Sequence, residues 1–265
     1  MCCFSITTPV GWFARLFAVP VRVSATNIFA RMVADGRQAL AYGMNLSARA
    51  PIALVLPLPV APGSGEDAVR FVDLAAEPRM FAELRELFEP PRMAARKTGG
   101  LALPSVSRPR LIVHAVGSFV ASYVPTVADF DRLDPQFRLP RVLFDAVPRY
   151  ADHGFAVFQL APGKVTVHPM ALSFPTRDPA RLFFPTVHVH DGRFHATARF
   201  DHALYFQTPR HRERPTTITL GALDRDVVGW MMPHKDYAGL VVPQQPLVRR
   251  TLHGRRANDD TWLPA

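Results

Sequence analysis

Short segments in which apolar and polar residues alternate recur along the chain, and dipeptides typical of tight turns separate three pairs of them. The turns are Asp35-Gly36 between residues 21–33 and 37–47, Pro162-Gly163 between residues 154–160 and 165–174, and Asp191-Gly192 between residues 183–190 and 193–207. Alternation with a period of two is typical of a strand with one buried face, and Asp-Gly favours the type I′ turn of a β-hairpin. The pattern therefore predicts three antiparallel hairpins, the first with Val33 opposite Gln38.

A continuous apolar run, IALVLPLPV at residues 52–60, is long enough for a buried strand. Because proline cannot donate a hydrogen bond to a neighbouring strand, Pro57 and Pro59 place this strand at a sheet edge or a bulge. Ser64, followed by Glu66 and Asp67, has the polar cap and acidic first turn of a helix. These signals predict a strand followed by a helix.

Three further segments have the sequence pattern of short helices. Residues 78–88 begin with proline and bring Phe81, Leu84 and Phe88 to one helical face. Thr126 and Asp129 have the spacing of a helix cap and its partner, and residues 140–147 predict a further short helix. Residues 90–109 lack periodicity and predict a long loop.

Together these elements predict an α+β fold, predominantly antiparallel β-sheet built of hairpins, with two to four short helices. Residues 1–248 are expected to form a single globular domain, since 265 residues approach the upper limit for one hydrophobic core. Residues 249–265, rich in arginine and then Asn-Asp-Asp, predict a basic and poorly ordered C-terminal tail.

The composition agrees with a strand-rich chain and argues against nucleic-acid binding. The 26 prolines break long helices. The net charge of +9 invites nucleic acid, but the basic residues are scattered rather than gathered on one predicted face. Only three of the 31 basic residues are lysines, a bias that a GC-rich genome produces throughout a protein. Nucleic acid is therefore a disfavoured partner, and a small molecule or a peptide is the expected class of substrate. The sequence does not determine the oligomeric state.

The two cysteines, Cys2 and Cys3, are adjacent and exclude a disulfide framework, which favours a reducing compartment. The apolar stretch at residues 9–21 contains Arg15, lacks a preceding basic region and is too short to span a membrane. We therefore expect a cytoplasmic protein without a membrane span.

The third predicted hairpin gathers histidines. If Asp191-Gly192 occupies the centre of the turn, His188 lies opposite His195 and His190 lies opposite Arg193. Directly paired residues share a face, as do alternate residues of one strand, so His188, His190 and His195 come together. His202 falls on the opposite, apolar face and is expected to be a buried structural histidine with a hydrogen-bond partner.

Three imidazoles within cross-strand reach are a candidate site for a divalent transition metal, Zn, Fe or Cu, with a coordination position open to water or substrate. The His-x-His pair with a third histidine resembles the metal arrangement of cupin-type barrels, although the Glu and Gly spacing of those proteins is absent. His168, in the second hairpin, is a possible fourth ligand. A solvent-facing polar face that uses histidine would give the same pattern without a metal.

Cys2 is the second chemical candidate. Removal of Met1 would leave Cys2 with a thiol and a free α-amine, the pair used by N-terminal nucleophile amide hydrolases. In this alternative Cys2 is catalytic and no ion is needed. The two thiols are alternatively soft metal ligands or a buried pair without chemistry. A non-enzymatic interaction module, recognised by a large exposed apolar patch, is the third class that the sequence leaves open.

Four segments carry a resemblance to a known family: MCCFS at the start, VLPLPV at residues 55–60, FFPTVHVHDG at residues 183–192 and FDHALYFQ at residues 200–207. In these segments the chain resembles a family of bacterial proteins of unassigned function, with residues 11–20 as an insertion. The resemblance implies a conventional folded domain and no particular chemistry.

Overall fold

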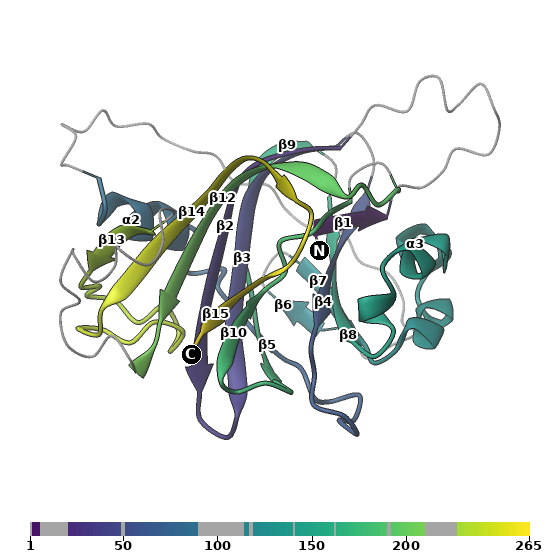
Figure 1. Cartoon of the computed structure of the whole chain (residues 1–265), viewed down its shortest axis with the longest axis horizontal. Helices are drawn as coiled ribbons and strands as arrows, with labels where there is room; N and C mark the ends of the chain where they lie inside the picture. Colours follow the sequence, from purple (N-terminus) through teal and green to yellow (C-terminus); the bar gives the residue numbers. More distant parts are fainter. Residues whose placement is uncertain are drawn as a thin grey trace.

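The computed structural model describes residues 2–5, 21–48, 51–89, 114–116, 119–139, 141–161, 163–189, 192–209 and 227–265. Two β-sheets account for most of this part of the chain (Figure 1). The first has the strand order β11 (His188–Val189), β1 (Cys2–Ser5), β4 (Ile52–Leu58), β8 (Gly154–Leu160), β7 (Phe119–Val124) and β6 (His114–Val116). The second has the order β13 (Val227–Met231), β14 (Leu247–Ala257), β12 (Thr197–Gln207), β2 (Arg22–Val33), β3 (Arg37–Ala48), β9 (Gly163–Pro175) and β5 (Arg70–Val72). Strands β10 (Arg181–Phe184) and β15 (Thr261–Pro264) form a separate antiparallel pair.

The predicted fold class is confirmed, because antiparallel pairs predominate and the helices are short. Only β1 with β11 and β2 with β12 run parallel among the described pairs. The helical elements are α2 (Met80–Glu86), α3 (Arg141–Ala146) and three 3-10 helices, η1 (Val127–Arg132), η2 (Pro135–Phe137) and η3 (Pro148–Tyr150). No helix in the described part of the chain is long and apolar enough to cross a bilayer.

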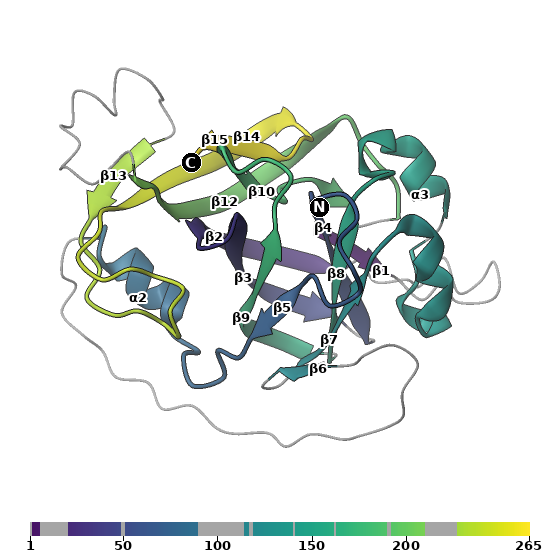
Figure 2. The same cartoon turned by 90° about the horizontal axis from the view of Figure 1, so that it is seen from below.

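The main core lies between the two sheets, and helices cover their outer faces (Figure 2). Leu54 and Phe158 of the first sheet belong to the same buried cluster as Leu40 and Phe174 of the second. A second cluster packs η1, η2 and α3 on the other face of β4 and β8, and a third packs α2 on the other face of β2 and β3. Strands buried on both faces explain why residues 52–58 are apolar without alternation.

The first predicted hairpin is present, with its register shifted by one residue. Asp35 and Gly36 both have positive φ, 60° and 66°, as a type I′ turn requires, and the Arg37 amide donates to the Ala34 carbonyl over 3.3 Å. Val33 nevertheless pairs with Arg37, not with Gln38. The turn chemistry was therefore predictable from the dipeptide, whereas the register was not.

The second and third predicted hairpins are wrong. Strand β8 pairs with β4 and β7, and β9 pairs with β3 and β5, so the segments on either side of residue 162 belong to different sheets. Strand β11 pairs with β1, and β12 pairs with β14 and β2. Strands β8, β9 and β12 are each paired along both edges with strands other than the predicted partner, which a two-stranded hairpin does not provide.

Two further predictions need correction. Residues 64–69 form turns and lead into β5, so the helix expected after Ser64 is absent, while the helix expected at residues 78–88 is α2. Residues 249–265 form most of β14 and all of β15 instead of a loose tail. Leu252 and Leu263 are buried in the main core, which gives this basic segment an apolar anchor.

Candidate functional site

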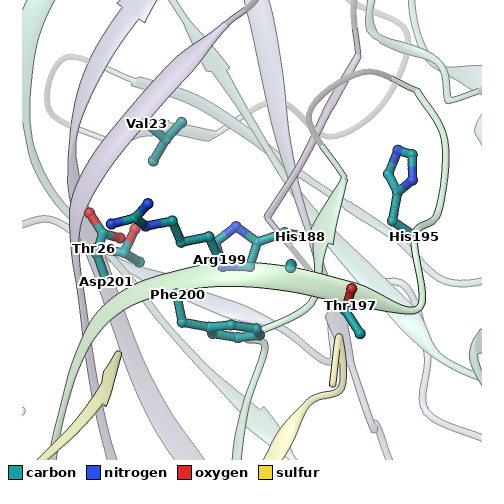
Figure 3. A pocket seen from close by; sticks show the side chains of 9 residues that line it. Val23, Thr26, His188, His195, Thr197, Arg199, Phe200 and Asp201 are labelled. Atoms are coloured by element: carbon teal, nitrogen blue, oxygen red, sulfur yellow. The ribbon is translucent and has the colours of Figure 1, made fainter. Parts of the chain in front are cut away.

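The candidate site is a pocket where β2 and β12 separate. Their parallel pairing begins at Thr26 and His202, and before this point the two strands diverge. The register of β2 with β3 shifts between Ser24 and Asn27, and Ala25 has a positive φ of 52°, so a bulge turns the start of β2 away. We call the diverging residues 22–25 of β2 and 197–201 of β12 the fork. Figure 3 shows Val23 on one arm, and Arg199 and Phe200 on the other.

The pocket in the fork has a volume of about 480 Å³, within the range of ligand-binding clefts. Its described walls are Val23, Thr26, His188, His195 and residues 197–201. At the inner end, the Ala25 amide donates a hydrogen bond of 2.8 Å to the Asp201 carboxylate, which ties the two arms together where they meet.

His188 reaches the pocket from β11, and Asn258 fixes its backbone. The His188 amide donates to Asn258 Oδ1 over 2.8 Å, and Asn258 Nδ2 donates to the carbonyls of His188 and His195 over 2.9 and 2.8 Å. The side chain of Asn258 is therefore hydrogen-bonded to both backbones that the third hairpin was predicted to pair directly. Asn258 is 1% exposed, so these bonds are protected from water.

The two residues after Asn258 hold the same segment. Thr186 donates through Oγ1 to the Asp259 carbonyl over 2.8 Å, and the Val187 amide donates to Asp260 Oδ1 over 3.3 Å. Asp260 also accepts a hydrogen bond of 2.5 Å from the Tyr150 hydroxyl, whose pKa lies well above its ordinary value because of burial and the neighbouring carboxylate. The Asn-Asp-Asp sequence thus positions β11.

The imidazole of His188 packs against a second imidazole that the hairpin prediction had placed on the opposite face. The rings of His188 and His202 lie 4.7 Å apart, edge to face at 66°. Phe200 closes the group, with ring centroids 4.7 Å from His188 and 5.3 Å from His202. Asp201 Oδ1 lies 4.0 Å from His202 Nδ1, a charge contact longer than a hydrogen bond. His202 is buried, as expected for a histidine on the apolar face of β12.

The structure describes two of the three predicted hairpin histidines, His188 and His195. His195 is exposed and lines the pocket at the end opposite Thr26 and Asp201 (Figure 3). His190 lies outside the described residues. No cross-strand pair joins His188 to His195, because the His188 strand pairs with β1.

His168 has a different environment. It lies on β9, which β3 and β2 separate from β12, a distance of about 14 Å at the usual strand spacing. Its ring packs on Phe119 with centroids 4.0 Å apart, and burial lowers its pKa, opposed by the Pro169 carbonyl and by Asp73. The structure therefore does not bring His168 to His202 and His188, and the prediction that it is a fourth ligand is not supported by its position.

Among the described residues, no group of three or more His, Cys, Asp or Glu side chains is arranged to hold a metal ion. The backbone of Cys2 nevertheless lies beside the site, because β1 runs parallel to β11 with Cys2 in register with His188 and Cys3 with Val189. The backbones of Cys2 and His188, one residue from each of the two chemical candidates, are therefore neighbours in the fold.

No protein-family model matches this chain, and no curated protein matches it. Among solved structures the chain is similar to baculovirus P35, with a TM-score of 0.48 and 12% identity over 94% of this chain and 98% of that one. It is also similar to a mutated baculovirus P35 after caspase cleavage, with a TM-score of 0.47 and 11% identity over 91% of this chain and 100% of that one. A complex of caspase-8 with P35 gives a TM-score of 0.45 and 10% identity over 91% of this chain and 96% of that one. A similarity of this size transfers no activity, partner or site residue to this chain.

Sequence reasoning missed His202, Asn258 and Arg199 as site residues. His202 has the alternation of a core position, and only the approach of β11 turns it into a neighbour of His188. Asn258 stands in a segment without periodicity, which predicts disorder unless its hydrogen-bond partners are known. Arg199 is one of many scattered arginines, and nothing local distinguishes it.

Proposed function

We propose that the protein binds a divalent transition metal in the pocket of the fork, with His188 and His202 as two of the ligands. The observation that carries the proposal is the contact between these two imidazoles, whose ring centroids lie 4.7 Å apart; His188 lines the open pocket and His202 is buried. Metal–nitrogen bonds of ~2.0–2.1 Å require the ligating nitrogens of two histidines to lie within roughly 4 Å of each other. With their ring centroids 4.7 Å apart and the rings edge to face, rotation of the two side chains would aim one nitrogen of each at a common ion.

The remaining ligands would come from residues whose side chains the structure does not describe. His190 follows His188 by two residues in the sequence, and Cys2 is in register with His188. Imidazole and thiolate both suit Zn²⁺, Fe²⁺ or Cu²⁺. His168 and His195 are left out of this ligand set.

A metal ion at this place would have the pocket on one side, open to a water molecule or a substrate atom. An open coordination position supports hydrolytic or oxidative chemistry, since a bound divalent ion polarises its ligands and acidifies water. We therefore propose a metal-binding protein that acts as a metal-dependent enzyme on a small molecule or a peptide. Its compartment is the reducing cytoplasm, which the absence of a disulfide framework favours.

Elemental analysis tests the metal proposal. Protein purified without a metal-affinity tag should carry close to one equivalent of Zn, Fe or Cu, and His188→Ala and His202→Gln should each lower that content at least tenfold. His168→Ala is the matched control, because it removes a half-buried histidine outside the site, and it should retain the wild-type content. Substoichiometric metal in the wild type, or equal loss in all three variants, would reject the proposal.

A second function is favoured by the parallel register of Cys2 with His188. A thiol beside an imidazole is the usual arrangement of an activated cysteine nucleophile. In this alternative His188 takes the thiol proton and the Cys2 thiolate attacks the amide carbon; the C–N bond breaks, the amine leaves with that proton, and water then hydrolyses the acylated Cys2, with no ion taking part.

Alkylation by iodoacetamide separates the two functions. If Cys2 is an activated nucleophile, its alkylation rate in EDTA-treated protein should exceed that of Cys3 at least tenfold at pH 7, and His188→Gln should abolish the difference. Peptide mapping assigns the label to each cysteine. Equal and slow labelling of both thiols would exclude the nucleophile and leave the metal proposal untouched.

A further inference from the structure

Each arm of the fork is a strand segment that pairs with a neighbouring strand along its outer edge. Its inner edge, which faces the other arm, has no strand partner among the described residues. Residues 22–24 of β2 pair with residues 45–47 of β3, and residues 197–201 of β12 pair with residues 253–257 of β14. On the sides that face each other across the fork, the described residues of these two arms form no ladder with each other or with a further described strand. Half of the backbone N–H and C=O groups of each arm therefore point into the fork and away from the strand already paired.

The geometry of such an edge matches an extended peptide. An edge strand is a template for the addition of another strand, with backbone hydrogen bonds giving affinity and alternate side chains giving specificity. Five residues of β12 span about 17 Å at the usual rise per residue, enough for a peptide of four to six residues. The pocket volume of about 480 Å³ is of the size that a short peptide segment needs.

Two arginines at the fork, Arg199 and Arg255, favour a peptide with acidic side chains. Arg199 lies on β12 directly opposite Arg255 of β14, and like charges in directly opposed positions destabilise a sheet. Neither guanidinium has a carboxylate within ion-pair distance in the described part of the chain; Arg255 donates through Nε to Thr197 Oγ1 over 3.1 Å. Asp201, the one carboxylate among the described residues that line the pocket, accepts a hydrogen bond from the Ala25 amide. Both arginines also line an adjoining hollow of about 470 Å³.

Apolar docking is a weaker alternative for this surface. Among the described residues only Val142 and Met231 are large, exposed and hydrophobic, and neither lies in the fork. Within the fork, Val23 and Phe200 supply apolar contact beside the cationic side chains. This combination suits a strand in which apolar and acidic side chains alternate.

We propose that the fork binds an extended acidic peptide, which adds to the edge of residues 197–201 that faces residues 22–25 and places a carboxylate side chain opposite Arg199. The carboxylate neutralises Arg199 and relieves its repulsion from Arg255, while apolar side chains of the peptide face Phe200. This inference goes beyond the metal proposal and does not depend on it, because no step uses an ion.

Fluorescence anisotropy with a labelled, acetylated hexapeptide of alternating valine and glutamate, measured in EDTA, tests the inference. We expect saturable binding that Arg199→Glu weakens at least tenfold and Arg255→Gln weakens about threefold. Arg181→Glu is the matched control, an exposed arginine on β10, and should bind as the wild type does. Thermal unfolding of each variant verifies that it is folded.

Two further peptides make the test specific for strand addition. The alternating valine and lysine peptide should bind at least tenfold more weakly, since its charge has the wrong sign. The valine and glutamate peptide methylated on alternate backbone nitrogens should also lose at least tenfold, since it lacks the donors that a strand edge requires. Absence of saturable binding, or equal binding of either modified peptide, would overturn the proposal. The presence of EDTA throughout keeps the result independent of metal content.

Discussion

Asn258 determines where His188 lies, although it carries no chemistry itself. Its side chain makes three hydrogen bonds to the backbones of His188 and His195 within the protein interior. A buried polar group that loses its partner costs more than the bond itself contributes, so this residue has a large effect on both stability and the site.

Asn258→Ala should lower the free energy of unfolding by roughly 2–4 kcal/mol, because it leaves the His188 amide and two carbonyls without their partner in a buried place. Urea unfolding monitored by tryptophan fluorescence measures the change. Gln244→Ala, which removes an exposed amide side chain, should change the free energy by less than about 0.5 kcal/mol. An equal, small effect of both substitutions would contradict the role assigned to Asn258.

His168 makes stability depend on pH. Its pKa is lowered by burial, so its neutral form is the one that the folded protein accommodates. Above the free histidine pKa of ~6.5 the residue contributes no pH dependence, because it is neutral in both states. As the pH falls below that value the unfolded chain binds a proton that the folded protein does not, so the free energy of unfolding decreases.

His168→Gln should therefore reduce the loss of stability between pH 7 and pH 5. The measurement is urea unfolding at the two pH values, with the exposed His234→Gln as the baseline for removal of one imidazole. If the two variants lose as much stability between pH 7 and pH 5 as the wild type does, His168 does not couple folding to protonation.

Among the elements, the C-terminal strands depart furthest from the sequence prediction. Residues 249–256 form a strand that their arginine-rich sequence does not predict. Their partners on β12 are distant in the sequence, so the pairing leaves no local alternation of apolar and polar residues. The apolar positions Leu252 and Leu263 were the available signal, since each belongs to the main core. Element β4 was easier to predict, and Pro57 is tolerated because β1 pairs only with residues 53–55 of that strand, which leaves Pro57 paired on one side.

Leu263→Ala should lower the free energy of unfolding by about 2–4 kcal/mol, the usual cost of truncating a buried leucine. Val142→Ala on α3 is the control, because its side chain is 67% exposed, and it should cost less than about 0.5 kcal/mol. Chemical denaturation of both variants compares them directly. A negligible effect of Leu263→Ala would indicate that residues 261–264 do not pack as β15.

At the scale of the whole molecule, the sequence predicts the fold class well and its topology poorly. Turn dipeptides and alternation identify strands, but the parallel pairs β1 with β11 and β2 with β12 join residues more than 170 positions apart and have no local signature. His188 was a candidate site residue from its neighbours in sequence, whereas its contact with His202 follows only from this long-range pairing. The candidate site therefore depends more on the pairing of strands distant in the sequence than on a local sequence motif.

The central claim is that His188 and His202 hold one divalent metal ion between them. Anomalous X-ray diffraction at the zinc edge, from crystals soaked in a zinc salt, tests it most directly. The account predicts an anomalous peak ~2.0–2.1 Å from one imidazole nitrogen of His188 and from one of His202, the usual Zn–N bond length. A peak bound to other residues alone, or no peak in the fork, would contradict the claim.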